Sequence, residues 1–128
     1  MLKKIVFMGT PDFSVTIMKS LYQNGYPISA VYTQPAKKSM RGQNTNKSPI
    51  QKLAENFNLN IRHPNFLNNN EEVLKYFKSL SDDIAIDVAY GQLIPKEVLS
   101  IAKNGLINIH VHLLPNVKGA APIHKATI

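Results

Sequence analysis

Residues 4–33 read KIVFMGTPDFSVTIMKSLYQNGYPISAVYT. The run over 4–8 is apolar after Lys4 and is typical of a strand that is buried on both faces of a parallel sheet. Gly9 follows it and favours a tight turn. The next two residues predict the start of a helix, with Thr10 as the N-cap and Pro11 at the first helical position.

The helix and the strand after it follow from the same stretch. Phe13, Ile17 and Leu21 recur at helical spacing, which predicts one apolar helix face. Gly25 favours a helix end just before it, and residues 28–33 again form an apolar, β-branched run. A strand, a helix and a second strand in this order indicate an α/β fold with a doubly wound, mostly parallel sheet.

Weaker patterns extend this fold along the chain. Residues 34–47 are polar and basic and predict a long loop, which in a compact domain is usually functional or disordered. The helix expected from 121 onward has no Gly or Asn at its end, which favours a truncated chain. The other expected helices cover 48–58, 68–80 and 96–102, and the other expected strands cover 60–62, 84–89 and 105–109.

Length and composition narrow the class of protein. A chain of 128 residues corresponds to about one domain. It contains no cysteine, which excludes disulfides and thiolate metal sites, and no apolar run approaches the ~20 residues that span a bilayer. We therefore expect a cytoplasmic protein. The net charge of +7 favours a polyanionic partner such as RNA, although a lysine-rich surface without any partner explains the charge equally well.

Asn108 and His110 form the candidate site. They stand two residues apart where the strand 105–109 gives way to a loop, so their side chains are expected on one side of a central strand. An amide can hold an oxyanion, and an imidazole can relay a proton near neutral pH. Together they suit acyl transfer to an amine, whereas a structural hydrogen-bonding role for the histidine remains the alternative.

The motifs around this pair resemble those of the folate-dependent formyltransferases. N-x-H at 108–110 is followed by LLP at 113–115 and GAAP at 119–122. GTPDF at 9–13 and AYG at 89–91, with Ile94 and Pro95 after it, are similar to the family branch that formylates methionyl initiator tRNA. The resemblance covers essentially the whole chain and implies a Rossmann-like formyltransferase fold.

The resemblance implies transfer of a formyl group from 10-formyltetrahydrofolate to the amino group of methionyl initiator tRNA. Residues 1–128 would be an incomplete N-terminal catalytic domain without the tRNA-binding domain, a fragment with impaired activity that is monomeric and needs no metal. Asn108 and His110 would be catalytic. The pterin pocket would be lined by Tyr90, Gly91, Gln92, Leu93, Ile94, Leu113 and Pro115, and the acceptor stem would meet Lys37, Lys38, Arg41 and Lys47.

Some residues depart from the family pattern. His112 stands where the family usually has Ser, and Asp87 stands in an apolar strand, where we expect it to lie deeper in the sheet than His110 and not to replace the family's later catalytic Asp. These departures leave a second interpretation open, a non-catalytic remnant that binds folate or RNA. A third is a zinc hydrolase with His110, His112 and His124 as ligands.

Overall fold

The computed structural model describes residues 2–38, 45–113 and 124–127, with the backbone alone for 111–113 and 124–127. Its centre is a five-stranded sheet in the order β5-β2-β1-β6-β7. Every pair of neighbouring strands in this sheet is parallel. The strands are β1 (Ile5–Gly9), β2 (Ile28–Tyr32), β5 (Ile61–Arg62), β6 (Ile84–Val88) and β7 (Leu106–Asn108).

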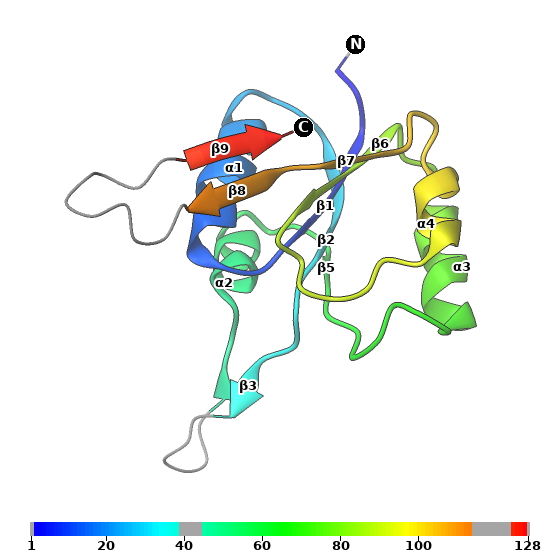
Figure 1. Ribbon diagram of the computed structural model, residues 1–128, viewed down its shortest axis with the longest axis horizontal. Coiled ribbons are helices and arrows are strands. Elements are labelled where there is room, and N and C mark those ends of the chain that lie inside the picture. The colour runs from blue at the N-terminus through cyan, green and yellow to red at the C-terminus, as the bar shows by residue number, and fades with distance from the viewer. Residues whose placement is uncertain (1, 39–44, 114–123, 128) are drawn as a thin grey trace, which may run out of the picture.

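Helices cover both faces of the sheet, which confirms the predicted doubly wound α/β fold. In Figure 1, α1 (Asp12–Gln23) and α2 (Pro49–Asn56) lie on one side of the strands, and α3 (Glu71–Ser79) and α4 (Lys96–Ile101) lie on the other. Successive residues of β1 point to opposite faces. Ile5 and Phe7 therefore join the apolar cluster under α1 and α2, and Val6 and Met8 join the cluster under α3 and α4.

The start of α1 differs from the prediction. Pro11 is the N-cap, and the side chain of Thr10 caps nothing, because its hydroxyl donates to the Tyr90 carbonyl at 2.7 Å and accepts from the Gln34 N–H at 3.2 Å. Phe13 is 43% exposed, so it does not share the buried face of the helix. The buried residues of α1 are Ser14 and Met18. The Ser14 hydroxyl donates to the Val88 carbonyl at the end of β6, which holds this face of the helix against the sheet.

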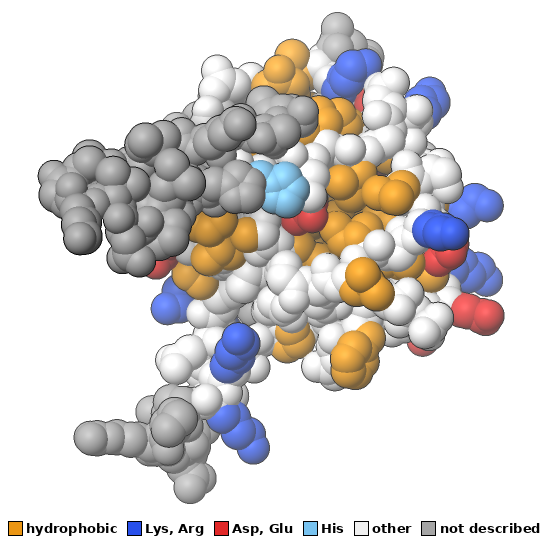
Figure 2. Space-filling view, viewed as in Figure 1, with side chains coloured by type: hydrophobic (Ala, Val, Ile, Leu, Met, Phe, Trp, Pro, Cys, Tyr) orange, Lys and Arg blue, Asp and Glu red, His pale blue; other side chains and the backbone are white. Residues whose placement is uncertain are grey.

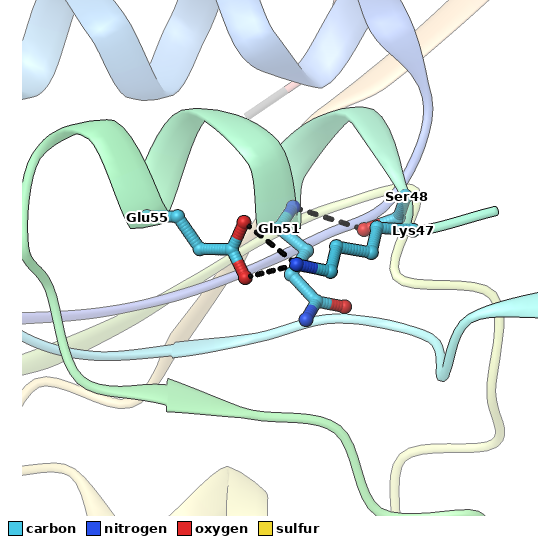
Figure 3. Close-up of polar contacts among 4 residues, drawn as sticks. All are labelled: Lys47, Ser48, Gln51 and Glu55. Atoms are coloured by element: carbon cyan, nitrogen blue, oxygen red, sulfur yellow. Dashed lines mark hydrogen bonds and ion pairs between the residues drawn. The ribbon is translucent and has the colours of Figure 1, made fainter. Parts of the chain in front are cut away.

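The expected start of a helix at residue 48 is confirmed. The Ser48 hydroxyl accepts from the backbone N–H of Gln51 at 3.0 Å, and Pro49 opens the helix (Figure 3). Such a cap satisfies one of the free N–H groups of the first turn. Helix α3 begins at Glu71, three residues later than expected. Its N-cap is Asn70, whose side chain accepts from the backbone N–H of Val73.

Two short antiparallel hairpins stand outside the main sheet. β3 (Lys37–Lys38) pairs with β4 (Thr45–Asn46), so the segment expected to be a loop is partly a hairpin. β8 (His110–Leu113) pairs with β9 (His124–Thr127), and the helix expected from 121 onward is therefore wrong over these residues. Helix propensity is a weak preference that pairing with a distant strand overrides. Among the residues that the structure describes, no helix is long and apolar enough to cross a membrane.

Candidate functional site

A pocket of about 190 Å³ lies where β6 and β7 end. Asp87 in β6 and Asn108 in β7 are register partners, so the two strands bring these residues side by side near their carboxyl ends. The pocket is lined by Phe13, Asp87, Ala89, Tyr90, Gly91, Asn108, Ile109 and His110. The carboxyl edge of a parallel sheet is the usual place for a ligand site.

The predicted pair therefore lines one pocket, although its setting differs from the expectation. Asn108 is the last residue of β7, which is an edge strand of the described sheet and not a central one. His110 is the first residue of β8 and is exposed, while Asn108 is half-buried. Between them the N–H of Ile109 donates to the Asp87 carbonyl at 2.8 Å, which fixes the chain at this edge.

Asp87 lies deeper than His110, as expected, because it is half-buried while His110 is exposed. It nevertheless lines the same pocket, and its carboxylate accepts from the backbone N–H of Tyr90 at 3.0 Å. Burial raises the pKa of Asp87, and the Tyr90 hydrogen bond and the positive charge of a protonated His110 lower it to a lesser degree. Figure 2 shows a histidine side chain against an acidic side chain on this face. The sequence did not indicate this shared pocket, because strand alternation predicts the face on which a residue lies but not where the neighbouring strand ends.

The turn after β6 presents its backbone to the pocket. Ala89 and Gly91 have positive φ angles of 55° and 93°, which turn the chain sharply at the strand end. The Tyr90 side chain points into the core and is 1% exposed, so this residue can offer a ligand its backbone only. Of the residues that follow, Leu93 is 71% exposed and Ile94 packs against the core.

Two glutamines join this turn to neighbouring loops. Gln34 donates to the Gly91 carbonyl at 2.7 Å, and its side-chain oxygen accepts from Gln92 at 3.1 Å. Gln92 also donates to the Pro64 carbonyl at 2.9 Å and accepts from the Leu67 N–H at 2.9 Å. A second pocket of about 500 Å³ lies over these contacts. Sequence reasoning missed the roles of Thr10 and Gln34, because a polar residue in a loop gives no local sign of its distant partner.

The basic residues occupy different settings. Lys37 and Lys38 are exposed in β3. Lys47 forms an ion pair with Glu55 of α2, at 2.9 Å and 3.2 Å to the two carboxylate oxygens, and this contact lowers the pKa of Glu55 (Figure 3). Arg41 and Pro115 lie outside the described residues, and for Leu113 only the backbone is described.

The zinc interpretation gains no support from the described part of the chain. Within it, no group of three or more His, Cys, Asp and Glu side chains could hold a metal ion. For His112 and His124 the structure describes only the backbone. The register of β8 and β9 pairs His124 with Leu113, so its backbone partner is neither of the other two histidines.

Comparison with known proteins identifies the family. The chain matches the formyl transferase family over residues 3–128, and it belongs to that family. It is 60% identical over 126 residues to a methionyl-tRNA formyltransferase of Pelagibacter ubique, and 45% identical over 125 residues to one of Clostridium perfringens. Each match covers 98% of this chain but only 41% and 40% of those proteins, so the chain spans about two fifths of their length.

Solved structures support the fold. A phosphoribosylglycinamide formyltransferase from Bacillus halodurans matches with a TM-score of 0.64 at 14% identity, over 98% of this chain and 79% of that one. A formyltetrahydrofolate deformylase from Pseudomonas putida matches with a TM-score of 0.63 at 21% identity, over 94% and 42%. These likenesses establish a Rossmann-like formyltransferase fold, as the sequence predicted.

Proposed function

We propose that this protein transfers a formyl group from 10-formyltetrahydrofolate to the amino group of methionyl initiator tRNA. Residues 1–128 would then supply the N-terminal part of the catalytic domain of a monomeric cytoplasmic enzyme. The observation that carries the proposal is one pocket lined by Asn108, His110 and the turn at Tyr90 and Gly91, in a chain of the formyl transferase family.

The chemistry needs an oxyanion site and a proton carrier. The methionyl amino nitrogen attacks the formyl carbon, and the carbonyl oxygen becomes an oxyanion that the Asn108 amide stabilises by hydrogen bonding. The bond from the formyl carbon to N10 of the folate then breaks. The amine loses one proton and N10 gains one, and His110 relays the proton from the amine to N10.

The turn after β6 is the proposed pterin site. Its residues Tyr90 and Gly91 line the pocket with Asn108, while the exposed side chain of Leu93 lines the second pocket and can pack on a flat ring there. Gln92 is already engaged by the loop at Pro64 and Leu67, so its side chain serves to hold the turn. Ile94, Leu113 and Pro115 complete the proposed lining.

The hairpin of β3 and β4 is the proposed contact with the acceptor stem. Lys37 and Lys38 are exposed on it, and lysines on such a hairpin engage phosphates without reading sequence. Arg41 belongs to the same proposed surface, and Lys47 joins it only when it leaves Glu55.

The test is an assay of the whole gene product with 10-formyltetrahydrofolate and charged initiator tRNA, measured as formylmethionyl-tRNA. Glycinamide ribonucleotide and water serve as competing acceptors. We expect transfer to the tRNA, and a fall in kcat of about 10²–10⁴ in Asn108→Ala and in His110→Ala.

Asn104→Ala is the matched control, because Asn104 is an exposed asparagine in the turn before β7 and lines none of the pockets described above. This variant should keep the wild-type rate. The proposal is wrong if the tRNA is not formylated, or if Asn108→Ala works as fast as Asn104→Ala.

A further inference from the structure

Asp87 contacts both halves of the pocket. Its carboxylate accepts from the Tyr90 N–H at 3.0 Å, and its backbone carbonyl accepts from the Ile109 N–H at 2.8 Å. Through the first contact it holds the turn that contains Gly91, and through the second it holds the segment between Asn108 and His110. One residue near the end of β6 therefore holds both the turn and the segment between the two proposed catalytic residues.

Among the described residues that line the pocket with the Asp87 carboxylate, one other group can carry charge near neutral pH. The titratable residues of the pocket are Asp87, Tyr90 and His110, and the rest of its lining from α1, β7 and the turn is uncharged. Burial raises the pKa of the Tyr90 phenol, so this group stays neutral. A half-buried carboxylate interacts more strongly with a nearby cation than an exposed one does, since less water screens the pair.

We propose that Asp87 is a positioning residue for His110 in the proposed formyl transfer, with its carboxylate orienting the imidazole and stabilising the imidazolium that forms as the proton is relayed. This inference rests on the proposed function. It assigns to a strand residue the role that a carboxylate beside a histidine has in other acyl-transfer sites, where it fixes the ring and stabilises its charged form.

A purely structural role makes a different prediction. If Asp87 only holds the turn, an amide oxygen should accept from the Tyr90 N–H equally well. Asp87→Asn keeps that acceptor and the side-chain size while it removes the charge. Asp87→Ala removes both, so the pair of variants separates the two roles.

The first measurement is the pH profile of formyl transfer by the whole gene product. We expect Asp87→Asn to keep the wild-type melting temperature and KM, to lose about tenfold or more in kcat, and to move the acidic limb of kcat/KM to lower pH by about one unit. Asp83→Asn is the matched control: it removes a carboxylate beside the other end of β6, where Asp83 accepts from the backbone N–H of Lys4 at 2.8 Å. It should change neither kcat nor the profile.

The second measurement does not depend on activity. The ring-nitrogen NMR signals of His110, assigned with His110→Gln, show which nitrogen carries the proton, and they should indicate one fixed tautomer in the wild type and a mixture in Asp87→Asn. The same tautomer in both proteins, or an unchanged kcat and pH profile in Asp87→Asn, would overturn the proposal and leave Asp87 as a turn residue. If the wild type formylates no tRNA, the proposed function fails, while the NMR comparison still decides whether the two side chains act as a pair.

Discussion

At the scale of single residues, Gly91 is the position with the least freedom in the proposed site. Its φ of +93° lies in the region that L-residues avoid, and a Cβ there would stand 2.9 Å from the Gln34 side-chain nitrogen. That nitrogen is the one that donates to the Gly91 carbonyl, so it cannot move away without losing the bond. Both the positive φ and the short distance to Gln34 therefore favour glycine at position 91.

We predict that Gly91→Ala lowers the free energy of unfolding by about 2 kcal/mol or more, about 1–2 from the backbone and the remainder from the contact with Gln34. Gly25→Ala is the control, because Gly25 has a similar φ of +85° and the nearest atom to its Cβ is 3.6 Å away. It should lose only the backbone part. Urea denaturation of both variants makes the comparison, and equal losses would contradict the clash.

At the scale of elements, the sequence predicts those parts whose cause is local. The run 4–8 predicts β1 because a parallel strand with helices on both sides is apolar throughout. Ser48 and Pro49 predict the start of α2 because a cap and a first-turn proline act within four residues. The carboxyl-edge position of Asn108 and His110 follows from strand order alone, and their catalytic roles stay predictions.

Elements and contacts that depend on distant partners were not predictable in this way. β8 and β9 form through a pairing of His110–Leu113 with His124–Thr127 that neither segment signals by itself. Thr10 fits a helix cap in the sequence but binds the carbonyl of Tyr90, 80 residues away. The position of Asp87 at the pocket was missed for the same reason, since it depends on where β7 ends beside β6.

The β3–β4 hairpin gives a prediction at this scale. Replacing Lys37 and Lys38 together with Ala should weaken binding of initiator tRNA and reduce the slope of log K against log salt by up to about 2, one for each lost phosphate contact. Lys47→Ala should change the slope less, because its ammonium is paired with Glu55. The measurement is a titration of the whole gene product at several salt concentrations.

The matching control removes two charges elsewhere. Lys19→Ala with Lys103→Ala takes exposed lysines from α1 and from the segment after α4. If this pair lowers the slope as much as the hairpin pair, the tRNA contact is spread over the surface and the hairpin has no special role.

At the scale of the whole molecule, Asp82 affects stability as pH changes. It is 3% exposed, accepts from the Ser29 hydroxyl, and has a second carboxylate oxygen without a partner among the described residues. Burial raises its pKa above the ordinary value of 3.8, with the Ser29 hydrogen bond opposing. The folded state therefore binds the proton of the Asp82 carboxyl group more tightly than the unfolded state does. The stability that this protonated carboxyl group contributes is lost as pH rises through the folded pKa.

We predict that Asp82→Asn raises the free energy of unfolding at pH 7 by on the order of 1 kcal/mol, because it removes a buried charge and keeps an acceptor for Ser29. The gain should shrink as pH falls toward the ordinary Asp value of 3.8. Urea denaturation of wild type and variant at several pH values tests this prediction. A gain in the free energy of unfolding that grows on acidification would contradict it.

The two apolar clusters on either side of the sheet also bear on how this sequence can change over evolutionary time. Val6 and Phe7 are neighbours in the chain but belong to different clusters, whereas Val6 and Met8 share one. Substitutions at sites without shared contacts add in their effects, while those in one cluster depend on each other. A lineage can therefore repack the side under α1 and α2 while the side under α3 and α4 stays as it is, and compensating changes are to be sought on the same face of the sheet rather than next along the sequence.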